Sequence, residues 1–167
     1  LGGTPNNPPD IFLDGVPAED TIANIVAGQT VRIPFQATDY DYAGQNGTGL
    51  QTVTVVPDGF MFARDLVNEN NCINVPGRTI SPCAYLQNMT PFLNTSVDPP
   101  RREISDLGGV ATEFVWNTKC YHIRTAGTGV PGQQFGIYSF VMRTFDNHCP
   151  IPGINYPTIT VRIRDPL

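Results

Sequence analysis

The sequence predicts an all-β protein, an antiparallel β-sandwich of about seven strands with a long loop insertion at its centre. Three observations predict this class. Glycine and proline number 16 each among 167 residues, which opposes long helices and favours short strands joined by turns. Several segments alternate apolar and polar residues with a period of two. Hydrophobic residues make up 40% of the chain, enough to form a core and to argue against disorder.

The first half of the chain divides into a lead-in and three strands. Residues 1–10 are polar and proline-rich, so we expect a linker or lead-in before a single domain over residues 11–167. Strands are expected at residues 11–13, 30–37 and 50–56. Asp14–Gly15 is a turn signal after the first strand. Pro34 lies within the second strand and cannot donate to a ladder, so it implies an edge or a bulge.

The second half is less regular before it becomes ordered again. Residues 57–59 predict a tight turn, and residues 84–89 are compatible with a short helix. No clear periodicity runs through residues 65–101, which we interpret as an insertion stapled by a local disulfide. Later strands are expected at residues 111–116, 134–145 and 158–164.

The charge balance excludes a nucleic-acid-binding protein, and the lengths of the apolar runs exclude a membrane-spanning helix. Ten basic and 15 acidic residues give a net charge of −5, and Lys119 is the only lysine. A nucleic-acid-binding protein would show a basic stripe, and the sequence has none. No apolar run approaches the about 20 residues that a membrane-spanning helix needs. The chain begins without methionine, so we expect a processed product or a segment of a longer protein.

The cysteine pattern favours disulfides and an oxidising compartment. Four cysteines occur, Cys72, Cys83, Cys120 and Cys149, without a C-x-x-C motif. Cys72 and Cys83 close a small loop across the turn at Pro76–Gly77, which favours their pairing. Pairing of Cys120 with Cys149 then follows by elimination, and no free thiol is expected.

The two histidines raise the questions of zinc binding and catalysis. His122 and His148 lie next to Cys120 and Cys149, so the four side chains are an alternative zinc site. Their spacing matches no common zinc module. No G-x-S-x-G motif accompanies the histidines, and no carboxylate pair stands out as a glycosidase pair. We therefore expect a protein that is not an enzyme.

Three segments together carry a family resemblance. Residues 37–41 read A-T-D-Y-D after a strand, residues 114–120 read F-V-W-N-T-K-C, and residues 138–150 end in D-N-H-C-P. In this order they resemble Ig-like and cadherin-like β-sandwich repeats of large Bacteroidota cell-surface proteins of the gliding and adhesin type. The usual proline after Trp116 is missing, and the insertion has no counterpart. The resemblance implies an Ig-like sandwich in a secreted, outer-surface protein.

An Ig-like strand order also predicts a candidate calcium site. In that order the loops after the second and the sixth strand lie at the same end of the sandwich. Asp39, Asp41, Asp146 and Asn147 would then cluster there, and the lead-in would bring Asp10 near. Carboxylate and amide oxygens are the ligands that calcium prefers, and calcium is the only cofactor expected. The alternative is ordinary turn chemistry, in which Asp and Asn bond their own backbone.

A further pattern suggests modification. Asp20-Thr21-Ile22 resembles the D-S/T-aliphatic acceptor of O-glycans in Bacteroidota, which makes Thr21 a candidate glycosylation site.

The function predicted from these observations is structural. We expect a non-catalytic, extracellular structural or adhesive repeat domain of a bacterial surface protein. Its partners would be neighbouring repeats or identical subunits, together with a surface glycan or a protein ligand. Two alternatives stay open: a self-assembling subunit of an extracellular filament or sheath, and a carbohydrate-binding module.

Overall fold

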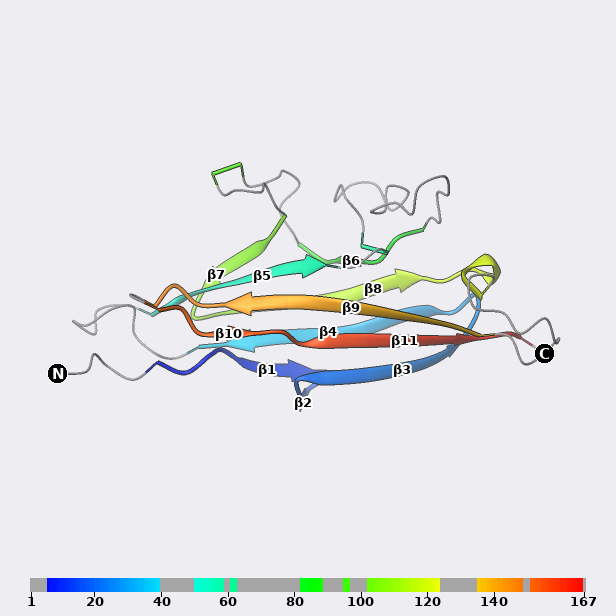
Figure 1. Cartoon of the computed structure of the whole chain (residues 1–167), viewed down its shortest axis with the longest axis horizontal. Coiled ribbons are helices and arrows are strands. Elements are labelled where there is room, and N and C mark those ends of the chain that lie inside the picture. The colour runs from blue at the N-terminus through cyan, green and yellow to red at the C-terminus, as the bar shows by residue number, and fades with distance from the viewer. Residues whose placement is uncertain are drawn as a thin grey trace.

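The computed structural model is an all-β structure made of two packed sheets (Figure 1). It describes residues 6–39, 50–58, 61–62, 82–88, 95–96, 102–123, 135–148 and 151–166. Its elements are β1 (Asp10–Leu13), β2 (Val16–Pro17), β3 (Asp20–Val26), β4 (Thr30–Thr38), β5 (Thr52–Asp58), β6 (Tyr85–Leu86), β7 (Ile104–Leu107), β8 (Gly109–Asn117), the 3₁₀ helix η1 (Cys120–Ile123), β9 (Phe135–Phe145), β10 (Ile154–Asn155) and β11 (Thr158–Arg164).

The strand order confirms the predicted sandwich class. Sheet A has the order β2-β1-β4-β8-β6, and sheet B has the order β3-β11-β9-β5-β7 with β10 beside β9. Neighbouring strands run antiparallel, except that β3 pairs with β11 in parallel. The beginning of the chain therefore contributes β1 to one sheet and β3 to the other. This division and the two strand orders are those of an Ig-like sandwich.

The core lies between the two sheets and explains the period-two segments. In β4 the residues Val31, Ile33 and Phe35 are buried, while the residues between them are exposed. Three phenylalanine rings fill the middle of the core, Phe62, Phe114 and Phe140. They meet edge to face with centroids 4.9–5.8 Å apart, a geometry that aromatic rings favour.

The helix expected over residues 84–89 is replaced by an edge strand. Tyr85 pairs with Val115 and Leu86 with Phe114, so β6 extends sheet A. Leu86 is buried in the core. A single turn of helix is marginal by itself, and pairing with β8 outweighs that weak local preference. Part of the predicted insertion at 65–101 thus belongs to the sandwich.

Pro34 lies in an interior strand, so the prediction that its strand is an edge or bulged is wrong. The reason behind that prediction, that proline cannot donate a backbone hydrogen bond, still explains where Pro34 lies in β4. β1 ends at Leu13, opposite Phe35, and the chain then turns at Asp14. The Asp14 N–H donates to the Pro34 carbonyl oxygen over 2.9 Å. The missing N–H of Pro34 therefore leaves no gap in the β1–β4 ladder, because β1 has already ended at this position.

The structure also changes the expected strand boundaries. β3 and β7 were not expected from the sequence, because neither combines a long alternation with a strongly apolar face. β5 continues to Asp58, with Pro57 opposite Met142 in β9. The turn expected at residues 57–59 therefore does not begin at Pro57. By contrast, β11 has the bounds predicted from its alternation.

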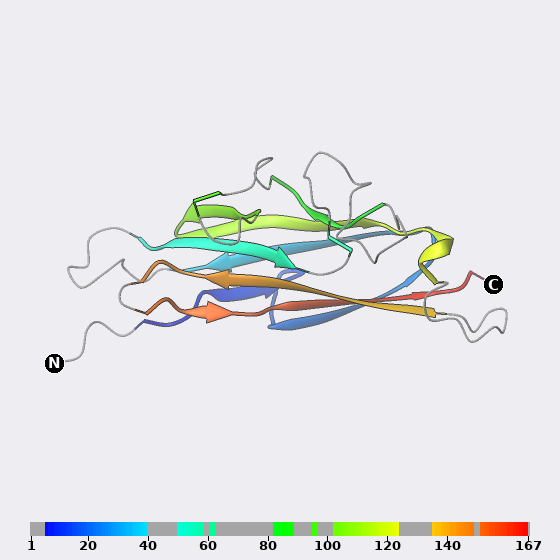
Figure 2. The same ribbon diagram turned by 45° about the horizontal axis from the view of Figure 1, so that its top comes forward.

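The strands run along the longest axis of the sandwich (Figures 1 and 2). β1 begins near one end, which we call the lead-in pole because residues 6–9 join the sandwich there. The opposite end carries η1 and the end of β11, and we call it the helix pole. No helix in the described part of the chain has the length and apolarity to cross a membrane.

Candidate functional site

Four distant segments meet at the lead-in pole. They are residues 6–9, the end of β4 at Asp39, the start of β5 at Gln51, and the residues that follow β9. β4 runs antiparallel to β1 and β9 runs antiparallel to β11, so both β4 and β9 end on this side, as in the Ig-like strand order. The chain therefore joins its sandwich through a polar cluster.

Asp146 organises this cluster. Its side chain is buried, with 1% exposure. Oδ1 accepts the backbone N–H groups of His148 at 3.0 Å and of Gly153 at 2.9 Å. Oδ2 accepts the side-chain amide of Asn6 at 2.9 Å. Hydrogen bonds from N–H donors to a carboxylate are stronger than those between neutral groups, so Asp146 ties three segments together.

A second set of bonds connects Asn6 to the start of β5. The Gln51 side-chain amide donates to Asn6 Oδ1 at 2.8 Å and lies 3.3 Å from His148 Nδ1. The backbone continues the connection toward β4: the Gly108 N–H donates to the Gln51 carbonyl at 2.8 Å, and the Asp39 N–H donates to the Gly108 carbonyl at 3.0 Å. Asn6 thus bridges the two buried side chains of Asp146 and Gln51.

Two further contacts fix the prolines of the lead-in. The Asn155 side-chain amide donates to the Pro9 carbonyl at 2.6 Å. A Cβ atom on Gly153 would lie 2.7 Å from both Pro8 Cα and Asp146 Oδ2. Only glycine lets the lead-in backbone approach this closely without a shift. Residues 6–9 are therefore a docked segment of the domain.

Of the five candidate calcium ligands the structure describes four, and these four differ in burial and in their contacts. Asp39 and Asp146 are both buried at the lead-in pole, and Asp41 lies outside the described residues. The Asn147 side chain accepts the N–H of Thr52 at 2.9 Å. Asp10 is exposed as the first residue of β1 and is not part of the Asp146 network.

The geometry of Asp146 is that of turn chemistry. Its bond to the His148 N–H closes an Asx turn, which is the alternative weighed against a metal site. Both of its oxygens already accept N–H donors. Among the described residues, no group of three or more His, Cys, Asp or Glu is arranged to hold a metal. Calcium needs six to eight oxygens, so Asp39 and Asp146 would need further ligands from Asp41 and the backbone. The calcium site stays a prediction.

Thermal unfolding tests this prediction directly. If calcium binds at the lead-in pole, calcium at a hundredfold excess over its Kd stabilises the fold by about 2.7 kcal/mol and raises Tm by about 5–10 °C. EDTA reverses the shift, and Asp39→Ala together with Asp41→Ala abolishes it. Equal melting temperatures in calcium and EDTA would leave only the turn chemistry.

The two histidines lie at opposite poles. The Tyr138 hydroxyl, near the start of β9, donates to the His122 carbonyl, whereas His148 follows the end of β9 and contacts Gln51. His122 is buried, and its Nδ1 accepts the Lys119 N–H at 2.8 Å. The alternative zinc site is therefore wrong, because β9 separates the two histidines by its length.

The same separation corrects the expected cysteine pairing. Cys120 is exposed at the start of η1 and has a free thiol. From Tyr138 to Phe145, β9 extends about 23 Å, and the Cα atoms of a disulfide lie within about 7 Å of each other. His148, the residue before Cys149 in the sequence, lies at the other pole. The predicted Cys120–Cys149 bond, and with it the absence of a free thiol, is wrong.

Cys83 is buried and disulfide-bonded, with its partner outside the described residues. It precedes β6, which pairs with the later half of β8 and so lies away from the lead-in pole. With Cys120 free, and with His148, the residue before Cys149, at the lead-in pole, we expect Cys72 to be the partner. Non-reducing peptide mapping should recover a Cys72–Cys83 peptide and alkylated Cys120. A Cys120–Cys149 peptide would contradict both this expectation and the arrangement of the poles.

Thr21, the candidate glycosylation site, lies within a strand rather than a loop. It is half-buried in β3, opposite Ile159 of β11. Ala23 and Ile25 have the same orientation and pack against the core. Whether Thr21 carries a glycan stays a prediction.

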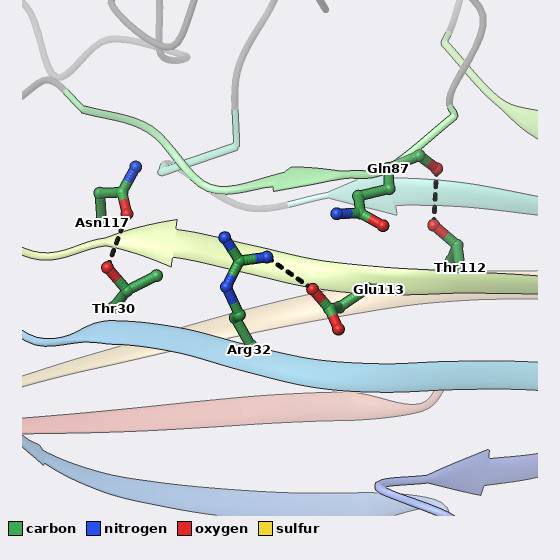
Figure 3. A network of polar contacts seen from close by, with 6 residues as sticks. All are labelled: Thr30, Arg32, Gln87, Thr112, Glu113 and Asn117. Carbon is green, nitrogen blue, oxygen red and sulfur yellow. Dashed lines mark hydrogen bonds and ion pairs between the residues drawn. The ribbon is translucent and has the colours of Figure 1, made fainter.

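The outer surface of sheet A bonds largely to itself. Figure 3 shows Thr30 Oγ1 donating to Asn117 Oδ1 at 2.7 Å and Arg32 paired with Glu113 at 2.7 Å. The Thr112 hydroxyl also donates to the Gln87 carbonyl at 2.6 Å. Exposed pairs of this kind contribute about 0–1 kcal/mol each. Where these pairs lie, the outer face of sheet A is polar and solvent-exposed, and it does not offer an apolar binding surface.

No protein-family model matches the chain, and the search of curated proteins found no relative. Solved structures give weak likenesses. AggA, the major subunit of aggregative adherence fimbriae from Escherichia coli, has 9% identity and a TM-score of 0.43, covering 99% of this chain and 100% of its own. A family 123 glycoside hydrolase from Clostridium perfringens has 8% identity and a TM-score of 0.42, covering 89% of this chain and 23% of its own. MyfA, the major Myf fimbrial subunit from Yersinia enterocolitica, has 13% identity and a TM-score of 0.40, covering 94% of this chain and 98% of its own. None reaches a TM-score of 0.5, so the fold assignment rests on the strand order alone.

Proposed function

We propose that the chain is a non-catalytic structural module of an extracellular bacterial assembly, in which modules follow one another end to end. The observation that carries the proposal is the path of the chain. It joins the sandwich at the lead-in pole, where residues 6–9 are docked, and leaves after β11 at the helix pole (Figure 1). A module entered and left at opposite ends of its long axis transmits force along that axis.

The docked lead-in makes this joint stiff. Proline-rich segments are semi-rigid by themselves, and here Asp146, Gln51 and Asn155 hold both sides of the segment. An undocked linker would let successive modules swing freely. The bonds to residues 6–9 therefore favour a spacer or rod over a flexible string of domains.

Composition supports a location outside the cell. The disulfide of Cys83 favours an oxidising compartment. A chain with a net charge of −5 and one lysine is also unsuited to nucleic acid. The resemblance of three segments to Bacteroidota surface repeats adds the expectation of a bacterial surface.

The end-to-end assembly has two forms, tandem repeats in one polypeptide and separate copies that form a filament. Electron microscopy and light scattering of the purified chain discriminate them. A filament subunit polymerises, whereas a repeat stays small and gives an elongated particle only when copies are joined in tandem. A carbohydrate-binding module would instead be retained on a glycan array. For that third function the described residues offer one strongly exposed aromatic ring, Tyr156.

Small-angle X-ray scattering of two copies joined head to tail tests the proposal. A stiff joint gives a maximum dimension close to twice that of one copy. Gly153→Ala, whose Cβ would collide with Pro8, should broaden the distance distribution without unfolding the sandwich. Ser139→Ala, on the exposed face of β9, is the control and should change nothing. A wild-type tandem as compact as a freely jointed pair would overturn the proposal.

A further inference from the structure

β3 is an edge strand whose outer side is unpaired among the described strands. It lies along the margin of the sandwich in both views (Figures 1 and 2), and sheet B ends with it. The backbone bonds define which groups face outward. The Glu19 carbonyl accepts the Thr158 N–H, and the Ala27 N–H donates to the Arg164 carbonyl, so odd-numbered residues bond to β11. In a parallel pair the alternate residues point both backbone groups away.

Three residues of β3 therefore point their backbone N–H and carbonyl groups away from β11. Asp20, Ile22 and Asn24 have outward backbone groups, and their side chains are exposed. Ile22 is 63% exposed, so a large apolar side chain lies uncovered at this sheet margin. The Val26 N–H, next in this series, is closed off by Gln29 Oε1 at 2.9 Å. The available edge thus ends just after Asn24.

This edge lacks most of the devices that prevent strand pairing. Natural edges are protected by charged side chains, especially lysine, by proline, by bulges or by very short strands. β3 has seven residues, carries one charged side chain, Asp20, at its first position, contains no lysine or proline, and pairs one to one with β11 without a bulge. The other edge of this side of the sandwich is β2, which is two residues long and contains Pro17. At this margin of the sandwich the edge of sheet A, β2, is therefore protected, and the edge of sheet B, β3, is largely unprotected.

We propose that β3 pairs antiparallel with β3 of a second copy, with the twofold axis at Ile22. In this register Ile22 lies opposite its symmetry mate, and Asp20 lies opposite Asn24 of the second copy on both sides of it. The series Asp-x-Ile-x-Asn is self-complementary, because each carboxylate faces an amide donor. Apolar pairs across neighbouring strands stabilise a sheet, and so do hydrogen bonds between an amide and a carboxylate on opposite strands. All outward backbone groups from Asp20 to Asn24 would be satisfied.

The occupant is another copy of this chain because the edge complements itself. A parallel arrangement would place Asp20 beside Asp20, and like charges in neighbouring strands destabilise pairing. The Val26 N–H is already bound by Gln29, so the available edge ends after Asn24. The proposed register pairs only residues 20–24 and therefore fits this length. Isologous contacts of this kind are the commonest way in which identical chains associate.

The pairing goes beyond the proposed end-to-end role, because it acts sideways. β3 runs along the long axis of the sandwich (Figure 1), so antiparallel pairing sets two modules side by side and pointing in opposite directions. Rods that extend from two facing surfaces have this orientation. Repetition along two rods would add many weak contacts into a strong one.

Cysteine cross-linking tests the register. Opposite residues of a hydrogen-bonded antiparallel pair have Cα atoms about 5.5 Å apart, within disulfide range. In a Cys120→Ser background, Ile22→Cys should give a disulfide-linked dimer under mild oxidation. Asn24→Cys should not, since its symmetry mate would be about 13 Å away along the strand. Cross-linking of Asn24→Cys but not Ile22→Cys would overturn the register.

A charge swap tests the pairing itself by analytical ultracentrifugation. Asn24→Asp places two carboxylates opposite each other at both ends and should raise the dissociation constant about tenfold. The double variant Asp20→Asn/Asn24→Asp exchanges the partners and should restore the wild-type constant. Ile137→Asp adds the same charge on the outer face of β9 and should change little.

The outcomes separate this pairing from the other ways in which the chain could associate. A chain that is monomeric from micromolar to millimolar concentration overturns the proposal. Loss of dimer with Ile137→Asp but not with Asn24→Asp overturns it in favour of a face-to-face contact. Binding of extended peptides with no dimer would assign the edge to a different partner and would also overturn it. End-to-end stiffness in the tandem experiment is unaffected by any of these results.

Discussion

Asp146→Ala is expected to lower the free energy of unfolding by about 3–5 kcal/mol, since it leaves three partly buried N–H donors without their shared acceptor. Asn6, His148 and Gly153 each donate to this carboxylate, which is 1% exposed. For a chain of this length the loss corresponds to a Tm lower by about 10 °C. Trp116 is the only tryptophan and is buried at a distance from the change, so its fluorescence reports unfolding.

Two comparisons separate the role of Asp146 from general damage. Asn147→Ala removes one acceptor from the neighbouring residue, which binds only the exposed Thr52 N–H, and should cost about 1 kcal/mol. Hydrogen exchange should show the His148 and Gly153 N–H groups losing protection in Asp146→Ala before the central strands do. A cost equal to that of Asn147→Ala, with these two N–H groups still protected, would contradict the assigned role.

The sandwich was predictable because its strongest strands carry their orientation in the sequence. In β4 and β11 every second residue is apolar, and this alternation shows which side faces the core. The common pole of Asp39 and Asp146 followed from the strand order and not from any local pattern. β3 and β6 were missed because each is defined by its partner strand, β11 or β8, and not by its own residues.

The hydrogen-bond cluster at the lead-in pole had no local signature. Asn6 lies 140 residues before Asp146 and 45 before Gln51, so only the folded chain brings them together. Gly153 gave only a weak signal, as a glycine that follows Pro150 and Pro152 in the sequence. The cysteine prediction failed for a related reason: pairing by elimination ignores which pole each loop occupies, and Cys120 is at the helix pole.

Trp116→Ala is expected to cost about 4–5 kcal/mol, because it opens a cavity where four segments meet. The indole is fully buried and packs against His122, Tyr138 and Phe140 at centroid distances of 4.9, 5.0 and 5.3 Å. Its Nε1–H donates to the Pro82 carbonyl at 2.9 Å. The side chain therefore holds η1, β9 and the segment before β6 at one place.

Trp116→Phe separates the ring packing from the hydrogen bond. The smaller ring keeps most of the aromatic contacts but leaves the Pro82 carbonyl without its donor, so a loss of about 1–3 kcal/mol is expected. Calorimetry measures both variants, since neither retains the tryptophan. Hydrogen exchange should show faster opening of residues 82–88 in Trp116→Phe, while β9 stays protected. If residues 82–88 keep wild-type protection in Trp116→Phe, the bond to Pro82 does not anchor this segment, and the disulfide of Cys83 holds it to the sandwich instead.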